Sequence, residues 1–189
     1  MKKLFILLVL LCSVAVSNAQ ENAQEKETEK SQSKAVLFEK SIGSLIRKDF
    51  YNLPKVSDVE NNVLILTDIL TGTKIGCLRM ETKYRGAYST DTYVGTLDFE
   101  ELDAAIKSLS YIKETILPTT PDAYSEIVFQ SKDDVKLGTY FNEKTKKWVV
   151  FIYTKSYTSR SATTCNETQL SEMIEIMKTA KSKIQELTK

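Results

Sequence analysis

The chain has 189 residues, of which 26 are basic, 25 are acidic and none is histidine, and 42% are hydrophobic. The missing histidine excludes the Ser-His-Asp and Cys-His nucleophile arrangements and histidine-ligated zinc sites. The near-zero net charge gives no electrostatic basis for nucleic-acid binding. We therefore expect a chain without metal, cofactor or nucleic-acid partner.

The first nineteen residues have the pattern of a secretory signal peptide. Lys2 and Lys3 form a cationic tip, an apolar run extends from Leu4 to Val16, and Ser17-Asn18-Ala19 supplies small residues for cleavage. The apolar run is shorter than the roughly 20 residues that a membrane-spanning helix needs. We expect cleavage after Ala19 and no transmembrane segment in the remaining chain.

The junction Asn18-Ala19-Gln20 resembles the signal sequences of exported proteins of Bacteroidetes bacteria. This resemblance is confined to the signal and implies a bacterial protein that is periplasmic or secreted. Removal of nineteen residues from 189 leaves 170, enough for one domain. Loss of Lys2 and Lys3 leaves 24 basic residues against 25 acidic ones, so the processed chain stays near neutrality.

Residues 20–34 contain four glutamates, three lysines and no large apolar residue, which predicts a disordered polar linker. We expect a single α+β domain over residues 35–189. Its first part is ambiguous: Ile42, Leu45 and Ile46 have helical spacing, whereas Gly43 and Pro54 oppose a long helix. We favour a strand there.

Five further runs are rich in residues that favour strands. They cover residues 63–70, 74–83, 126–131, 135–141 and 147–155. Thr71-Gly72-Thr73 separates the first two and predicts a hairpin turn. The last run is apolar on both of its faces, which predicts a central strand in a sheet.

Two amphipathic helices are the clearest elements. The first carries an apolar stripe from Leu102 to Ile116 and is followed by Pro118, and the second carries one from Leu170 to Leu187. Asp98 with Glu101, and Asn166 with Gln169, have the spacing of a capping box at the two helix starts.

A shift of about 68 residues aligns the two helices and their caps. The chain is therefore open to interpretation as two strands-then-helix units, residues 57–117 and 124–189, although any two amphipathic helices can be aligned in phase. If the duplication holds, the units would make one antiparallel sheet with two helices packed on one face, and the uncovered face of that sheet would be the natural binding surface.

Two loops ahead of the helices are rich in tyrosine, hydroxyl groups and arginine. We single out Tyr84, Arg85 and Tyr88 in the first and Tyr157 and Arg160 in the second. Tyrosine faces and arginine forks near a helix N-terminus favour polar or anionic ligands, although solvated loops have the same composition. We treat these five residues as a candidate ligand-binding site.

Cys77 and Cys165 are the two cysteines outside the signal. An oxidising compartment would permit them to form a disulfide, and two buried free thiols are the alternative. For function, we expect a non-catalytic protein, an exported module that binds a glycan, peptide or protein. The alternative is a histidine-independent hydrolase of envelope polysaccharide, which needs two acids converging in one cleft.

Overall fold

The structure is a computed structural model that describes residues 32–189. The predicted signal peptide and residues 20–31 of the predicted linker lie outside the described residues. The remainder of that linker is ordered, contrary to the prediction. Ser33 is fully buried, and its Oγ accepts a hydrogen bond from the backbone N–H of Val36 at 3.1 Å and lies 3.2 Å from Thr96 Oγ1. Ser33 thereby caps a helix that starts at Lys34.

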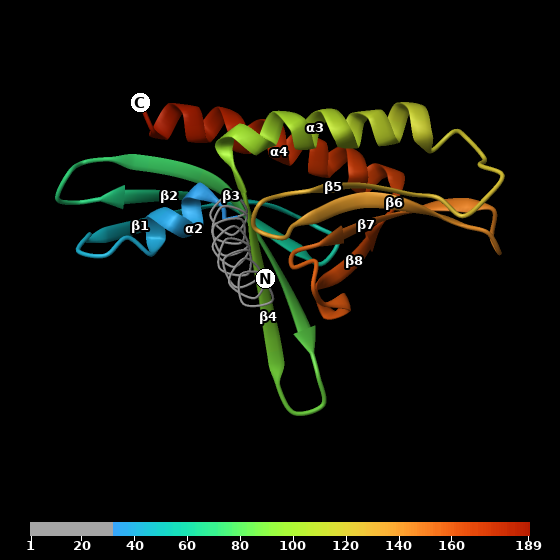
Figure 1. Cartoon of the computed structure of the whole chain (residues 1–189), viewed down its shortest axis with the longest axis horizontal. Helices are drawn as coiled ribbons and strands as arrows, with labels where there is room; N and C mark the ends of the chain where they lie inside the picture. The colour runs from blue at the N-terminus through green and yellow to red at the C-terminus, as the bar shows by residue number, and fades with distance from the viewer. Residues whose placement is uncertain (1–31) are drawn as a thin grey trace, which may run out of the picture. The chain divides into compact units, whose positions relative to one another are not determined.

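The described elements follow one another as a helix, four strands, a helix, four strands and a helix (Figure 1). The first half comprises α2 (Lys34–Glu39), β1 (Ile46–Val56), β2 (Val59–Asp68), β3 (Lys74–Arg85), β4 (Thr90–Asp98), a 3-10 turn (Phe99–Glu101) and α3 (Leu102–Tyr111), which continues as a π-helical turn (Ile112–Ile116). The second half comprises β5 (Glu126–Gln130), β6 (Lys136–Asn142), β7 (Lys147–Tyr153), a 3-10 turn (Ser159–Ser161), β8 (Ala162–Cys165) and α4 (Glu167–Leu187).

The predicted class, α+β with antiparallel strand pairing, is confirmed. The strands form two four-stranded sheets rather than one: the first sheet has the order β1-β2-β3-β4 and the second the order β5-β6-β7-β8. Each sheet is a meander in which neighbours in sequence pair side by side. Each half therefore has the order four strands then helix, and the first strand begins at Ile46 rather than at residue 57.

The strands that sequence patterns identified are present, and β7 lies between β6 and β8 as a central strand. Gly72 adopts a positive φ of 74° in the predicted turn between β2 and β3. Two strands were not predicted, β4 and β8. Both stand at an edge of their sheet, where polar alternation and a length of only four residues in β8 weaken the hydrophobic signal.

Both helix starts use the predicted caps. The Asn166 side chain accepts from the N–H of Gln169, and the Gln169 side chain accepts from the N–H of Asn166, both at 2.9 Å. Glu101 likewise accepts from the N–H of Asp98 at 2.9 Å. The Asp98 carboxylate also accepts from the N–H groups of Lys34 and Ala35 at the start of α2, a contact across more than sixty residues that no local pattern contains.

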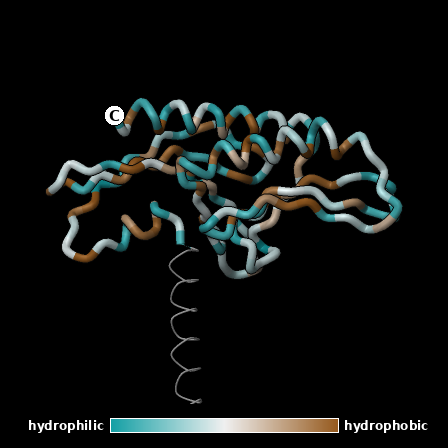
Figure 2. Tube along the Cα trace, turned by 45° about the horizontal axis from the view of Figure 1, so that its top comes forward, coloured by the Kyte–Doolittle hydropathy of each residue, from teal (hydrophilic) through white to brown (hydrophobic). Residues whose placement is uncertain are grey.

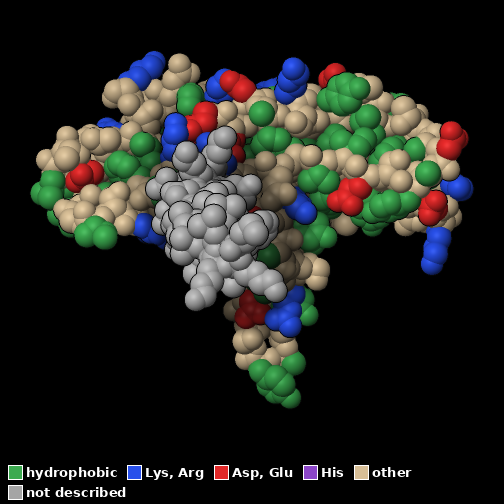
Figure 3. All heavy atoms as spheres, viewed as in Figure 1, with side chains coloured by type: hydrophobic (Ala, Val, Ile, Leu, Met, Phe, Trp, Pro, Cys, Tyr) green, Lys and Arg blue, Asp and Glu red, His purple; other side chains and the backbone are tan. Residues whose placement is uncertain are grey.

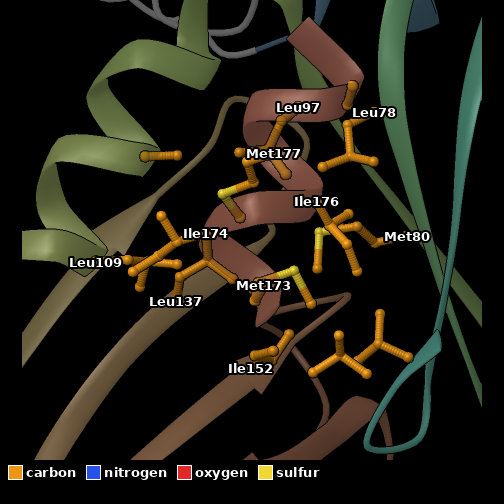
Figure 4. Close-up of a cluster of buried hydrophobic side chains, with 14 of the residues drawn as sticks. Leu78, Met80, Leu97, Leu109, Leu137, Ile152, Met173, Ile174, Ile176 and Met177 are labelled. Carbon is orange, nitrogen blue, oxygen red and sulfur yellow. The ribbon is translucent and has the colours of Figure 1, made fainter. Parts of the chain in front are cut away.

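The main core lies between the helices and the inner faces of both sheets. Helix α4 packs against β1, β2, β3 and β8, and α3 packs against α4 and β6. Leu109 from α3, Leu137 from β6 and Ile174 from α4 meet in this core (Figure 4). Figure 2 shows the alternation of hydrophilic and hydrophobic residues along the two long helices that produces these buried stripes.

A smaller cluster covers part of the opposite, outer face of the first sheet. Ala35 and Phe38 of α2 pack there on Leu64, Leu66 and Cys77. Alternation along the strands explains the separation, since Cys77 points outward and its neighbour Leu78 points into the main core. The outer face of the first sheet is thus partly closed by α2.

Side-chain hydrogen bonds join the two halves near β4. Thr82 Oγ1 lies 2.7 Å from Thr154 Oγ1. The Asp133 carboxylate, in the turn between β5 and β6, accepts from the backbone N–H of Thr96 at 2.9 Å and pairs with the Lys155 ammonium at 2.6 Å. Because Thr96 belongs to β4, Asp133 ties the second sheet to the first.

Candidate functional site

A groove crosses the outer face of the second sheet, the face turned away from the main core. Alternation decides which residues reach it. Leu137 and Ile152 point into the core, so the side chains of Lys136 and Tyr153 point outward, and position 138, a glycine, faces the same side. The groove has a volume of about 710 Å³, inside the 300–1,000 Å³ range typical of small-molecule sites. We call it the aromatic groove and define it by Tyr124, Glu126, Lys136, Tyr140, Phe151 and Tyr153.

Small residues hollow the groove. Gly138 stands opposite Phe151 in the β6–β7 pair, and Ala162 stands opposite Tyr153 in the β7–β8 pair. A Cβ at position 138 would collide with the carbonyl oxygen of Ile127 and lie 2.9 Å from the Phe151 ring. Only glycine therefore allows the ring of Phe151 to settle against the sheet.

Three aromatic rings lie together in this hollow. The ring centroids of Phe151 and Tyr140 are 6.1 Å apart and tilted by 32°, and those of Phe151 and Tyr153 are 5.4 Å apart in an edge-to-face arrangement. Phe151 is only 5% exposed, whereas Tyr140 and Tyr153 are half-buried. Phe151 thus holds two tyrosine rings in fixed orientations beside the open space.

The charges of the groove are balanced and lie at its two ends. Glu126 pairs with Tyr140 across β5 and β6, and Lys136 is four residues from Tyr140 along β6, a separation of about 13 Å along an antiparallel strand. The Tyr124 hydroxyl donates to Glu126 at 3.4 Å. Partial desolvation and the nearby carboxylate raise the pKa of Tyr124, so its hydroxyl remains a hydrogen-bond donor near neutral pH.

The arrangement suits non-covalent binding. Its polar groups are hydroxyls, one ammonium and one carboxylate.

Within residues 32–189, no cluster of three cysteine, aspartate or glutamate residues could hold a metal ion. The same part of the chain contains no helix long and apolar enough to cross a membrane.

The predicted loop site is only partly assembled. The Arg160 guanidinium lies 5.2 Å from the centre of the Tyr84 ring and pairs with Asp91 at 3.2 Å. Tyr93 and Asp91 raise the pKa of Arg160, consistent with a cation already held by its neighbours. The two predicted loops do meet, but Asp91 of β4 neutralises the arginine that was expected to receive an anion.

The other three predicted residues stay apart from this contact. Tyr88 is fully exposed near the tip of the β3–β4 hairpin, where Figure 3 shows hydrophobic side chains, and Tyr157 is 73% exposed. Arg85 is also exposed. None of the five predicted residues lines the aromatic groove.

Cys77 and Cys165 are both buried free thiols and form no disulfide. Cys77 lies under α2 on the outer face of the first sheet, and Cys165 borders the main core at the end of β8. Burial, reinforced by the charge of Asp98, raises the pKa of Cys77 to about 12, and burial raises that of Cys165 to about 11. Such thiols are poor nucleophiles.

Sequence reasoning did not single out the groove residues Tyr124, Tyr140, Phe151 and Tyr153, although Tyr153 begins the second of the two tyrosine-rich segments. One signal was available, because the second apolar face of β7 consists of Val149, Phe151 and Tyr153, and two of these three side chains are aromatic. The two apolar faces were interpreted as the mark of a central strand. Both described long helices pack on the opposite side, and the outer face remains open.

Comparison of the chain with protein-family models, with curated proteins and with solved structures gave no match.

Proposed function

We propose that the protein is an exported, non-catalytic binding module whose ligand occupies the aromatic groove. Export is supported by the cationic tip, apolar run and small residues of positions 1–19. Binding is supported by a concave, half-apolar site with a few polar groups converging on it. Its position on the open outer face of the second sheet, where a ligand has access, also supports binding there.

A comparison of the two sheets carries the proposal. In the first sheet, Leu97 precedes Asp98, the cap residue ahead of α3, and pairs with Leu78. In the second sheet, Cys165 precedes Asn166, the cap of α4, and pairs with Val150. Matching these two pairs makes Leu78 of β3 equivalent to Val150 of β7.

The equivalents of the groove residues then follow from the registers. Phe151 corresponds to Arg79, Tyr153 to Glu81, and Gly138 to Asn62. In the first sheet, Arg79 and Glu81 form an ion pair of 2.5 Å. The same positions of the same architecture thus accept charged side chains, so the fold itself does not require aromatic residues there. A ligand gives a reason for them.

The hydrolase alternative finds less support in the groove. Such an enzyme needs two carboxyl groups about 5–10 Å apart across the scissile bond. Glu126 is the one carboxylate among the described residues that line the groove. A smaller cavity of about 240 Å³ contains both Asp98 and Glu100, but Asp98 binds the start of α2 and Glu100 pairs with Lys34 at 2.6 Å.

An array experiment tests the binding proposal. The protein is expressed from its full coding sequence and purified in the form that the cell produces. It is then applied to an oligosaccharide array and a peptide library. We expect ligands whose binding is lost in the double variant Tyr140→Ala/Tyr153→Ala. Phe50→Ala removes an exposed aromatic ring from the first sheet and is the matched control, which should bind normally.

Two results would argue against the proposal. Equal binding by the double variant and the wild type would place the ligand site elsewhere. Cleavage of a bound oligosaccharide, detected by mass spectrometry, would favour the hydrolase.

A further inference from the structure

We infer that the aromatic groove selects a neutral oligosaccharide, laid across the rings of Tyr140, Phe151 and Tyr153. This inference rests on the proposed function, because it names the chemistry of the ligand in the same groove. Three features of the groove support it: the kind of apolar surface, the balance of charge, and the position on the face of the sheet.

The apolar surface of the groove is made of rings. Among the described residues that line it, Ala162 is the one aliphatic side chain, and none is leucine, isoleucine, valine or methionine. A pyranose ring presents flat patches of C–H groups, which pack against an aromatic face, and a rim of hydroxyls. Tyrosine offers a ring face with a hydroxyl at its edge, so it matches both parts of a sugar.

The polar groups of the groove also match a sugar. Ser156 and Thr164 add hydroxyl groups to those of the tyrosines. Hydroxyls both donate and accept hydrogen bonds, as sugar hydroxyls do. Lys136 and Glu126 stand at opposite ends and cancel in charge, so a polyanion meets no excess of positive charge there. A neutral ligand meets no electrostatic penalty in this arrangement.

A peptide fits the groove less well. Extended peptides bind through main-chain hydrogen bonds to a free sheet edge, and their side chains enter pockets beside it. The groove lies on the face of the sheet, where the backbone groups of β6 and β7 are already paired with neighbouring strands. The aliphatic lining that would receive leucine or valine anchors is missing from the described groove residues.

The span of the groove indicates more than one sugar unit. Tyr140 and Tyr153 stand on neighbouring strands with the Phe151 ring between them, so their rings are offset along the groove. Glu126 stands opposite Tyr140 and Lys136 stands opposite Tyr153, so each charged side chain flanks one of the two tyrosines. A short chain of sugars can contact both tyrosine rings at once, whereas a single sugar can contact one.

The test is isothermal titration calorimetry of the protein, expressed from its full coding sequence, with five neutral hexasaccharides: cellohexaose, laminarihexaose, maltohexaose, mannohexaose and chitohexaose. Heparin and a pool of random decapeptides are the comparison probes. We expect at least one hexasaccharide to bind and heparin not to bind. The dissociation constant should change less than about twofold between about 20 and 300 mM NaCl, because the contact is uncharged.

Matched variants locate the contact. Tyr140→Ala/Tyr153→Ala should weaken hexasaccharide binding at least about tenfold, since both ring faces are lost. Tyr140→Phe/Tyr153→Phe keeps the rings and loses the hydroxyls, so it should weaken binding by a few-fold. Phe50→Ala should bind as the wild type does. If the alanine double variant does not fold, the phenylalanine double variant still tests whether the tyrosines contact the hexasaccharide.

The outcomes separate this inference from the proposed function. If no hexasaccharide binds, or if heparin or the decapeptides bind through the tyrosines instead, the saccharide inference is wrong. If heparin or the decapeptides bind through the tyrosines, the proposed function of the groove still stands. If the alanine and the phenylalanine double variants both bind a hexasaccharide as the wild type does, the inference and the proposed function are both contradicted.

Discussion

The ring of Phe151 occupies the space that a side chain at Gly138, its partner across the β6–β7 pair, would fill. This relationship shapes the groove, because it brings the phenylalanine down against the sheet and lets Tyr140 and Tyr153 stand on either side of it. A glycine in a strand interior usually weakens the strand, so its presence here has a specific structural reason.

Gly138→Ala should destabilise the fold by about 1–3 kcal/mol, since the new Cβ meets both the Ile127 carbonyl and the Phe151 ring. Gly86→Ala is the control, because its nearest neighbour would be 3.4 Å away. Urea unfolding of both variants measures the difference. Equal stability of the two would show that the Phe151 ring can move aside without cost.

Leu109→Ala and Ile174→Ala should each lower the free energy of unfolding by about 2–5 kcal/mol. Both side chains lie in the main core, at 2% and 6% exposure, and truncation leaves a cavity there. Ile42→Ala removes a fully exposed side chain and should change the stability by less than about 0.5 kcal/mol. A core variant as stable as Ile42→Ala would contradict the packing in Figure 4.

Asp133→Ala should cost about 2–4 kcal/mol, because it removes the carboxylate partner of the Lys155 ammonium and of the Thr96 N–H at a site where both charged side chains are about 15% exposed. Asp58→Ala removes an exposed carboxylate and should be near neutral. Chemical denaturation at constant pH compares them. If the free energy of unfolding of Asp133→Ala equals that of Asp58→Ala, Asp133 does not tie the two sheets together.

Both described thiols should resist alkylation by iodoacetamide at pH 8 and react once the protein is unfolded in guanidinium. The pKa values, raised to about 12 for Cys77 and about 11 for Cys165, keep the sulfurs protonated at that pH, and burial blocks the reagent. Mass spectrometry without reductant counts the added groups. A disulfide would appear as two cysteines that stay unmodified after unfolding.

Expression of the full coding sequence in a bacterial host should yield a chain that starts at Gln20, if residues 1–19 direct export and are removed. Intact-mass measurement of the protein from the periplasm and medium determines the N-terminus. A chain recovered from the cytoplasm with Lys2 and Lys3 still present would contradict the proposed export.

Local pattern was sufficient for much of the fold. The stripes from Leu102 and from Leu170, with their caps, predicted both long helices, since period and capping depend on residues only a few positions apart. Edge strands β4 and β8 escaped prediction. So did helix α2, whose first N–H groups bind Asp98, more than sixty residues away.

The candidate site was less predictable. Tyr84 and Arg160 do meet, but Asp91 could not be assigned to Arg160 from the sequence, because the two are 69 residues apart and meet only after β4 forms. Likewise, alternation placed Cys77 and Leu78 on opposite faces, but which face α2 would cover was not encoded in that alternation.

The sequence by itself determined the periodic elements, the absence of histidine and the near-neutral charge, because each is a property of composition or of neighbouring residues. Only the tertiary structure decided that the strands divide into two sheets, that the long helices pack on the inner faces, and that the aromatic side of β7 stays open. Those outcomes depend on contacts between segments far apart in the chain. An alternating strand indicates two faces, and only the packing of its distant partners determines which face is buried.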